Sequence, residues 1–546
     1  MNDAQSKKSA QSEKSAQSMN GAQSLVRTLV GGAVNVCFTN PGTSEMHFVA
    51  ALDSEPGMRC VLGLFEGVVT GAADGYYRMT GTPAATLLHL GPGLGNGLAN
   101  LHNAKKARSG IVNIVGEHAR DHIRYDAPLT SDIAGIARPM SHWVRTAASS
   151  MSVAADGAAA IHEARRSPGQ IATLILPADT AWNAAGGVAS VLADEPLARP
   201  SSAAVRAAAL ALNVQERVRQ SVQQKPGEGA MLLLGGRAVR GRCLELAGRI
   251  AAKTGCTLAG EFGLARHERG AGRVHLQRVP YVVEAAVAML KDVQQLVLVG
   301  ARVPVSFFAY PDKPSVLIQP HCQVTELAGV EADLEAALQA LADELGASAT
   351  APAHVAQLAR PELPTGALTA DGIAAVVGAL MPENAVVVDE SVTTGRGFAR
   401  LTSTTVPHDW LSLMGGAIGL GLPMAVGAAI GAPGRRVIAL EGDGSAMYTE
   451  QALWTMAREG LDVTVLIFAN RAYQILRGEL TGVGAGTPGK RANDMLTLDR
   501  PSLDWVSLAK GHGVAAARVD DLSGLATQMS HALAASGPFL IELVLP

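Results

Sequence analysis

Short apolar runs alternate with amphipathic stretches along most of the chain. The runs are rich in Val, Ile, Leu and Ala and are typical of strands buried on both faces of a parallel sheet. They occupy positions 34–39, 60–64, 84–90, 111–115, 173–176, 231–234, 296–299, 316–318, 437–440 and 463–468. Helical patterns lie between them, and repeated strand–helix units indicate parallel sheets with helices on both faces. The pattern predicts an α/β fold of doubly wound parallel sheets.

Two stretches rich in Ala, Pro and Ser interrupt this alternation and predict linkers, at 187–203 and 347–366. The linkers divide the chain into three expected domains, which span residues 22–186, 204–346 and 367–546. Residues 1–21 repeat Ala-Gln-Ser between Lys, Ser and Glu. Such a polar, low-complexity segment cannot bury a core, so we expect a disordered tail without a catalytic role.

Composition excludes several classes of protein. The 546 residues are 48% hydrophobic and 17% charged, as in a well-packed globular chain. A net charge of −3 gives no reason to expect a nucleic-acid partner, and no apolar run reaches transmembrane length. The five cysteines form no Cys-x-x-Cys pair, which argues against zinc and a disulfide framework. Since no apolar signal segment precedes the fold, we expect a cytoplasmic protein without membrane contacts.

The strongest candidate chemistry follows the apolar run at 437–440. Asp443 comes directly after this strand, between Gly442 and Gly444, and Asn470 comes directly after the next one. Carboxyl ends of parallel strands meet at the edge where α/β sheets bind ligands. A carboxylate and an amide oxygen suit Mg²⁺ or Ca²⁺, and Ser445 is predicted to begin a helix whose free N–H groups favour phosphate. The spacing predicts a metal–diphosphate site; a tight turn is the alternative.

The sequence GDGS, followed at this distance by Asn, resembles the thiamine diphosphate motif of the superfamily of 2-oxo acid decarboxylases and acetohydroxyacid synthases. The resemblance spans nearly the whole chain and implies pyrimidine-binding, middle and diphosphate-binding domains in that order. It also implies that Asp443, Asn470 and the backbone of Ala472 hold Mg²⁺ on the diphosphate. Tyr473, which follows Ala472, is assigned to the same cofactor site.

The segment LFEGVVTGAADGYYRMTG resembles the part of the family in which a glutamate meets N1′ of the aminopyrimidine. That role would fall to Glu66, whose carboxyl group would favour the imino tautomer that removes the C2 proton. The loop MGGAIGLGLP resembles the partner segment, where the carbonyl of Gly416 would accept the 4′-amino group and Ile418 would lie under the cofactor. Glu390 and Thr393, at another strand end, would flank the diphosphate. A dipole-stabilised helix carboxylate and plain core packing are the alternatives for Glu66 and Ile418.

The sequences NPGTSEMHF and LLHLGPGLGNG resemble the benzoylformate decarboxylase branch. They imply a proton-handling role for His89, and they place Thr43 where that branch has Ser. A lone His at a strand end is more often a core residue. The branch has a second His near the position of Ala309, which is missing here unless a nearby residue such as His321 replaces it. Ile475 and Glu479 replace smaller or aromatic pocket residues, so the substrate is open.

Two rival motifs are rejected. The glycines of 91–97, with Glu117 further along, imitate a dinucleotide-binding fingerprint, but their spacing is GxGxGxG and Pro92 interrupts the turn. Residues 484–490 fit GxxxxGK, but Arg491 replaces the required Ser or Thr and no strand leads into the loop.

We therefore interpret the chain as a thiamine diphosphate- and Mg²⁺-dependent enzyme that decarboxylates a 2-oxo acid, giving an aldehyde or a carboligation product. An acetolactate synthase-type carboligase is the near alternative, and a non-catalytic cofactor-binding scaffold is the alternative of another class. FAD stays open as a further cofactor of the middle domain. The resemblance also implies a homodimer or homotetramer, since the two ends of the cofactor would be held by different chains.

Overall fold

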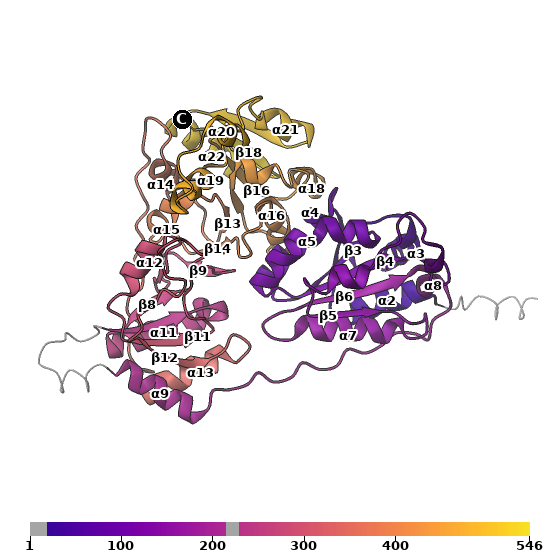
Figure 1. Ribbon diagram of the computed structural model, residues 1–546, viewed down its shortest axis with the longest axis horizontal. Coiled ribbons are helices and arrows are strands. Elements are labelled where there is room, and N and C mark those ends of the chain that lie inside the picture. Colours follow the sequence, from indigo (N-terminus) through magenta and orange to yellow (C-terminus); the bar gives the residue numbers. More distant parts are fainter. Residues whose placement is uncertain (1–18, 214–228, 546) are drawn as a thin grey trace, which may run out of the picture. The chain divides into compact units, whose positions relative to one another are not determined.

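A computed structural model describes residues 19–213 and 229–545, which form three sheets built mainly from parallel strands (Figure 1). Most of the predicted tail, residues 1–18, lies outside the described residues. Its last residues differ from the prediction, because Asn20 caps the first described helix, α2 (Gly21–Gly31). The Asn20 side chain accepts a hydrogen bond from the Gln23 backbone, and the Gln23 side chain accepts one from the Asn20 backbone. Such a capping box stabilises a helix start, so the ordered fold begins inside the predicted tail.

The first sheet has six strands in the order β2-β1-β3-β4-β6-β5, and all neighbours are parallel. Its strands are β1 (Val36–Asn40), β2 (Arg59–Leu62), β3 (Ala84–Leu88), β4 (Ile111–Glu117), β5 (Trp143–Thr146) and β6 (Ile171–Pro177). Every residue of β3, β4 and β6 is buried, which explains their continuous apolar runs. The helices of this part are α2, α3 (Met46–Asp53), α4 (Glu66–Thr80), α5 (Leu90–Ala107), α6 (Ile133–Ala137), α7 (Val153–Arg165) and α8 (Ala178–Trp182).

The second sheet has five parallel strands in the order β10-β8-β7-β11-β12. They are β7 (Ala230–Leu234), β8 (Thr257–Gly260), β10 (Gln277–Arg278), β11 (Gln295–Val299) and β12 (Gln323–Ala328). The helices around them are α9 (Ser202–Leu212), α11 (Gly241–Thr254), α12 (Val283–Leu290) and α13 (Leu334–Glu344).

The strand predicted at 316–318 is wrong. Val316 makes only an isolated bridge to Val305, and β12 takes the edge position of the sheet instead. Val316 is 50% exposed, and Pro314 and Pro320 flank the run. Because proline has no N–H to donate to a ladder, a short run between two prolines pairs poorly.

The third sheet has seven strands in the order β17-β18-β16-β15-β13-β14-β9. Its strands are β13 (Val386–Glu390), β14 (His408–Ser412), β15 (Val437–Gly442), β16 (Val463–Ala469), β17 (Ala515–Val519), β18 (Phe539–Val544) and the antiparallel β9 (His267–Arg269). The helices are α14 (Ala370–Leu380), α15 (Phe398–Leu401), α16 (Gly421–Gly431), α17 (Asp443–Ala446), α18 (Ala452–Glu459), α19 (Gln474–Gly482), α20 (Lys490–Met495), α21 (Trp505–Gly511) and α22 (Leu522–Ala534). The single helix expected after Asp443 is divided into α17 and α18, and Gly460 ends α18 with a left-handed φ of 61°.

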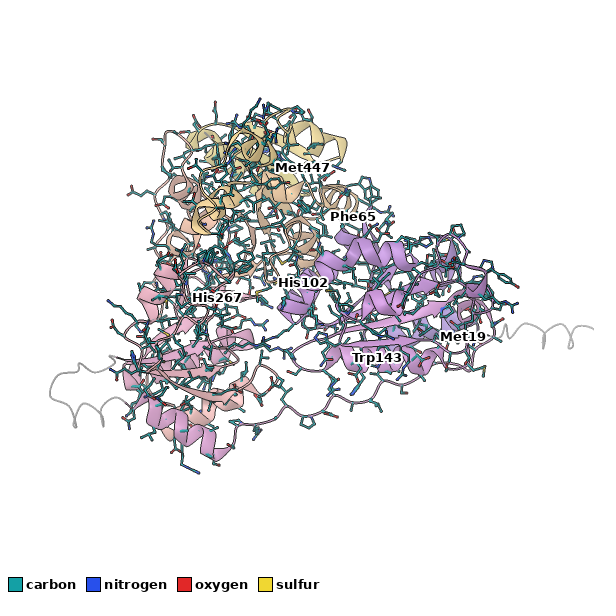
Figure 2. All side chains as sticks on the ribbon, viewed as in Figure 1. Met19, Phe65, His102, Trp143, His267 and Met447 are labelled. Atoms are coloured by element: carbon teal, nitrogen blue, oxygen red, sulfur yellow. The ribbon has the colours of Figure 1, made fainter. Side chains whose placement is uncertain are left out.

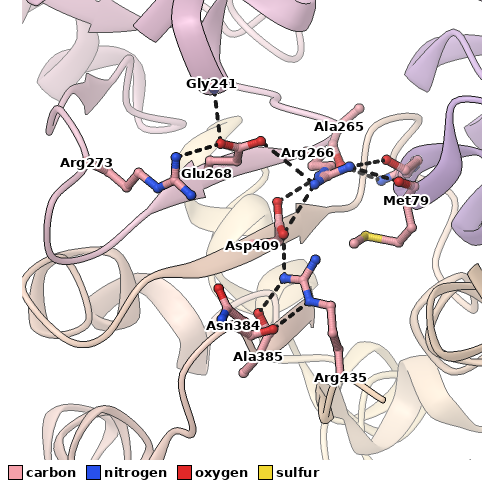
Figure 3. Close-up of polar contacts among 11 residues, drawn as sticks. Met79, Gly241, Ala265, Arg266, Glu268, Arg273, Asn384, Ala385, Asp409 and Arg435 are labelled. Carbon is pink, nitrogen blue, oxygen red and sulfur yellow. Dashed lines mark hydrogen bonds and ion pairs between the residues drawn. The ribbon is translucent and has the colours of Figure 1, made fainter. Parts of the chain in front are cut away.

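Strand β9 comes from the middle of the chain but pairs with β14, and buried ion pairs support this junction. Asp409 of β14 accepts hydrogen bonds from Arg266 at 2.7 Å and from Arg435 at 2.5 Å (Figure 3). Arg266 also donates to the Met79 carbonyl at 3.0 Å. Burial alone would raise the pKa of Asp409, but the two guanidinium groups lower it below its ordinary value. The network therefore stabilises the ionised carboxylate.

The described residues form two compact units. Residues 19–73, 82–101 and 110–194 form the first, and residues 74–81, 102–109 and the described part of 195–545 form the second. The three predicted domain boundaries stay a prediction. Among the described residues, none of the helices has the length and hydropathy needed to span a bilayer.

Candidate functional site

Asp443 and Asn470 lie together at one edge of the third sheet. Strands β15 and β16 are parallel neighbours, with Gly442 opposite Phe468, so the residues that follow them are close. The Asp443 carboxylate accepts the backbone N–H of Arg471 at 2.7 Å and that of Gly444 at 2.9 Å. The Asp443 carboxylate and the Asn470 amide, which the sequence predicts as metal ligands, therefore lie on adjacent loops.

Asp443 is 3% exposed, and this burial raises its pKa to about 6, while the two N–H donors act in the opposite direction. Its carboxylate, the Asn470 amide and the Ala472 backbone are hard oxygen donors that suit Mg²⁺. In residues 19–213 and 229–545 no group of three or more His, Cys, Asp or Glu could hold a metal ion. A cation at Asp443 would therefore need further oxygen ligands, such as those of a diphosphate.

The loops around this edge are tightly constrained. A Cβ at Gly444 would lie 2.5 Å from Cε1 of Tyr473, so the tyrosine ring packs directly on the glycine. Arg471, between Asn470 and Ala472, has a φ of 55°. A non-glycine residue in this region costs of order 1–3 kcal/mol, and such strain is concentrated at functional sites. A Cβ at Gly442 would make only ordinary van der Waals contacts, the nearest with Ser445 Oγ at 3.5 Å.

The loop that holds Gly416 and Ile418 is anchored by two side chains of α5. Asn103 donates from Nδ2 to the Ala417 carbonyl at 2.8 Å. Nε2 of His102, which Figure 2 labels, lies 3.1 Å from the Gly415 carbonyl. Gly416 is exposed and has a φ of 79°, and a Cβ there would lie 2.8 Å from Cζ of Phe307. Ile418 is half-buried. Substitution of Gly416 would therefore strain its backbone and displace the phenyl ring.

Glu390 supports the far end of the same loop. Its two carboxylate oxygens accept the N–H groups of Gly419 at 2.8 Å and Gly421 at 2.5 Å. Burial raises its pKa to about 7, against the effect of these N–H donors. Burial next to Glu390 also raises the pKa of Glu441 well above its ordinary value. The pair thus retains a proton near neutral pH.

Ile475 and Glu479 line one cavity of about 380 Å³, together with Thr393. Both lie on α19, four residues apart, and so on one face of the helix. Tyr281 donates from its hydroxyl to Oε1 of Glu479 at 3.0 Å. Within the described part of the chain the cavity lining includes no histidine, so His321 does not line it and Ala309 has no substitute there.

In the first unit, Glu66 is the first residue of α4 and is 7% exposed. It follows Phe65, which is marked at the start of this helix in Figure 2. Asn96 of α5 donates from Nδ2 to Oε2 of Glu66 at 2.9 Å. A Cβ at Gly93 would lie 3.1 Å from Oε1 of Glu66 and 3.3 Å from Cβ of His89. The first turn of α5 therefore brings the two predicted catalytic residues together.

His89 pairs with Glu45, which follows β1. Nδ1 of His89 lies 2.8 Å from Oε2 of Glu45, and the same oxygen accepts the Gly42 N–H at 2.8 Å. The Glu45 side chain is fully buried, whereas that of His89 is 24% exposed. Since a carboxylate only accepts hydrogen bonds, Nδ1 carries the proton and Nε2 is left for another partner. Thr43 is exposed on the adjoining 3₁₀ turn.

Four contributors to these sites were not predicted from the sequence: Glu45, Asn96, Tyr281 and Glu441. The first two lie inside the quoted motifs, but only the packing of β1, α4 and α5 reveals their partners. Residues 91–97 lie within α5 and not in a turn, which agrees with rejecting a dinucleotide fingerprint. Residues 484–489 lie between α19 and α20, and Lys490 begins α20, so a helix and not a strand leads into this loop and it does not form a P-loop.

Comparison with known proteins gives matches over both ends of the chain. Residues 19–136 match the family model "Thiamine pyrophosphate enzyme, N-terminal TPP binding domain", and residues 393–543 match its C-terminal counterpart. A Mycobacterium tuberculosis protein named "Putative acetolactate synthase large subunit IlvX" is 52% identical over 96% of this chain and 98% of its own length. Benzoylformate decarboxylase of Pseudomonas aeruginosa is 31% identical over 93% of this chain and 95% of its own.

Solved structures agree on the fold. A thiamine diphosphate-dependent 4-hydroxybenzoylformate decarboxylase of Rhodococcus jostii superposes with a TM-score of 0.82 at 24% identity. The superposition covers 96% of this chain and 99% of the other. At this identity the likeness shows the fold alone and leaves the substrate open.

Proposed function

Because the chain belongs to the family of thiamine pyrophosphate-dependent decarboxylases and acetolactate synthases, we propose that it decarboxylates a 2-oxo acid with thiamine diphosphate and Mg²⁺. The observation that carries this proposal is the buried carboxyl group of Glu66, which is bonded to Asn96 and lies beside His89. A scaffold that only bound the cofactor would have no use for such a carboxyl group. We therefore do not favour the non-catalytic alternative.

The residues at the edge of the third sheet suit the diphosphate end of the cofactor. Asp443, Asn470 and the backbone of Ala472 would hold Mg²⁺, and Gly442, Gly444 and Ser445 would lie beside the diphosphate. The Gly416 carbonyl would accept the 4′-amino group, and Ile418 would lie under the cofactor. When bound, the cofactor would supply the thiazolium ring that accepts the electrons released with CO₂.

The chain's own residues would manage the protons. The Glu66 carboxyl group would share a proton with N1′ of the pyrimidine, and the bond from Asn96 keeps it oriented. Glu45 fixes the Nδ1–H tautomer of His89, so Nε2 is the atom that can take or give a proton at the substrate. Thr43, on the same loop as Glu45, would contact the substrate carboxylate region.

Two products are compatible with these groups. His89 favours protonation and release of an aldehyde. The cavity beside Ile475 lacks a histidine among the described residues, and this favours addition to a second carbonyl compound, as in an acetolactate synthase. The name of the Mycobacterium tuberculosis relative supports the second product, and the Pseudomonas aeruginosa relative supports the first.

Product analysis separates the alternatives. The purified protein is incubated with thiamine diphosphate and Mg²⁺ and with pyruvate, benzoylformate, or pyruvate plus an acceptor aldehyde. Aldehyde formation from a single 2-oxo acid identifies a decarboxylase, and acetolactate from pyruvate identifies a carboligase. If the protein binds the cofactor but forms neither product from any of these mixtures, the proposed function is wrong.

A further inference from the structure

Several side chains hold the loop formed by residues 415–421. His102 and Asn103 of α5 bond to its first half, and Glu390 bonds to its second half. The Gly416 carbonyl, between these points, accepts no hydrogen bond in the part of the chain that the structure describes. The group that the loop would offer to the cofactor is therefore left available while the backbone around it is held.

Asn103 contacts both polar groups of one loop residue. Its Nδ2 donates to the Ala417 carbonyl at 2.8 Å, and its Oδ1 accepts the Ala417 N–H at 3.3 Å. Asn103 is fully buried, with 0% of its surface exposed. An Asn side chain carries both a donor group and an acceptor, so it can bond to both groups of a backbone residue at the same time. The two peptide groups that meet at Ala417 are therefore fixed in orientation.

This contact decides the direction of the Gly416 carbonyl. The Gly416 carbonyl and the Ala417 N–H belong to one peptide group, which is planar and trans, so the two bonds point in opposite directions. Because the N–H points at Asn103, the carbonyl points away from that side chain. The carbonyl that would accept the 4′-amino group is thus aimed by a side chain that would not itself touch the cofactor.

Without Asn103 the peptide group between Gly416 and Ala417 would be free to rotate. Gly416 has a φ of 79°, and glycine adopts positive and negative φ with similar ease. Rotation in the wild type would leave the buried amide of Asn103 without these partners, which is unfavourable for a polar group away from water. The side chain also lies close to the loop backbone, since a Cβ at Gly415 would lie 2.4 Å from Oδ1 of Asn103. The buried amide therefore selects one orientation of this peptide group.

We propose, on the basis of the proposed function, that Asn103 is a positioning residue for thiamine diphosphate. It holds the Ala417 N–H so that the Gly416 carbonyl faces the 4′-amino group. It also holds the Ala417 carbonyl, and this bond keeps the next residue, Ile418, in place under the cofactor. The alternative is that Asn103 only packs α5 against the loop and contributes to stability alone.

Three variants separate the two roles. Asn103→Ala removes both bonds, and Asn103→Asp keeps an acceptor for the Ala417 N–H but loses the donor. Asn113→Ala is the matched control, because Asn113 is also fully buried and its amide also makes two bonds, with Thr86 at 2.7 Å and Thr173 at 3.0 Å. Each protein is checked by thermal melting. Exchange of the loop amides is measured without cofactor, and exchange of the cofactor C2 proton and steady-state kinetics are measured with thiamine diphosphate and Mg²⁺.

In Asn103→Ala the Ala417 amide should exchange faster than in the wild type. C2-proton exchange and kcat should both fall by about threefold to tenfold, as for the loss of one neutral hydrogen bond. KM for the 2-oxo acid should stay near the wild-type value, because the loop would contact the cofactor and not the substrate. Asn103→Asp should slow C2 exchange less, since it still accepts the Ala417 N–H. Asn113→Ala should melt at a lower temperature and keep the wild-type amide exchange, C2 exchange and kcat.

A folded Asn103→Ala variant with wild-type C2 exchange would overturn the inference, and so would an Asn113→Ala variant that slows C2 exchange to the same extent. If neither Asn103 variant folds, the wild type decides. An Ala417 amide that exchanges freely in the cofactor-free protein then overturns the inference, and a protected amide supports it. A wild-type protein that binds the cofactor and exchanges its C2 proton but turns over no 2-oxo acid would instead refute the proposed function and leave the inference standing.

Discussion

Replacing Glu66 with Gln changes one proton-sharing group and little else. Gln has the shape of Glu, and its amide oxygen can accept the bond from Asn96 that Oε2 accepts at 2.9 Å in the wild type. The amide nitrogen then occupies the position of Oε1, near the backbone of Gly93. That nitrogen carries hydrogens but cannot take up a proton, so the exchange of a proton with the pyrimidine is lost.

The expected changes in stability and in turnover follow from the hydrogen bond that Gln keeps and the proton transfer that it loses. The bond to Asn96 is kept, and a buried carboxyl group that is 7% exposed is replaced by a neutral amide, so we expect the stability to change by no more than about 1 kcal/mol. General acid–base catalysis typically contributes about a hundredfold to ten-thousandfold, so we expect turnover to fall by at least about tenfold to a hundredfold. This corresponds to about 1.4–2.7 kcal/mol of transition-state stabilisation.

Three assays test the prediction together. Calorimetry should give near-normal thiamine diphosphate binding, steady-state kinetics should give the loss of turnover, and NMR should give slower exchange of the C2 proton of the bound cofactor. Asn96→Ala is a useful control, because it keeps the carboxyl group of Glu66 and removes only the hydrogen bond that orients it. This variant should lower turnover less than Glu66→Gln does. Unchanged C2 exchange in Glu66→Gln would refute the role assigned to Glu66.

Four further predictions concern other parts of the chain. Asp443→Ala should abolish retention of thiamine diphosphate in calorimetry, and wild-type affinity in that variant would mean that the metal site is misassigned. Wild-type protein should have a higher kcat/KM for pyruvate than for benzoylformate, and Ile475→Ala should shift this ratio toward benzoylformate; an unchanged ratio would show that Ile475 does not shape the pocket. Light scattering should show a dimer or tetramer at assay concentration, and a fully active monomer would contradict the expected sharing of the cofactor between chains. Asp409→Asn should lower the melting temperature at pH 7, since loss of one partner of a buried ion pair costs about 3–5 kcal/mol; because the pKa of Asp409 is lowered in the fold, its contribution is present at neutral pH and is lost as pH falls through the folded-state value, so melting curves of the two proteins should converge in acid and should not converge if the ion pairs are unimportant.

The sequence was sufficient to predict the parallel sheets, because strands buried on both faces leave continuous apolar runs. It was also sufficient to predict that Asp443 and Asn470 lie close together, because residues at the ends of neighbouring parallel strands meet at one edge of the sheet. The short strand at 316–318 was wrong because an apolar run between two prolines has the composition of a strand without its hydrogen bonds. The origin of β9 could not be predicted, since its partner β14 is distant in sequence and three residues carry too weak a signal.

The spacing of residues along the sequence could not predict which side chains contact the candidate catalytic residues. Glu45 and His89 meet because β1 and β3 are adjacent, and no local pattern encodes that adjacency. The place of Glu390 beside the diphosphate stays a prediction, but the bonds that its carboxylate accepts from the backbone of the loop that holds Gly416 and Ile418 could not be predicted from the sequence. Tyr281, in the loop between β10 and α12, reaches Glu479 of α19. Side-chain contacts between distant segments depend on packing, and the sequence pattern contains little information about it.

Release of labelled CO₂ tests the central claim most directly. The protein is stripped of small molecules, reloaded with thiamine diphosphate, Mg²⁺, both or neither, and given 2-oxo acids labelled with ¹³C at the carboxyl carbon. We predict that labelled CO₂ appears only when thiamine diphosphate and Mg²⁺ are both present, and that Glu66→Gln slows its release. A protein that binds both and releases no label from any 2-oxo acid, or one that releases it equally without them, would contradict the account.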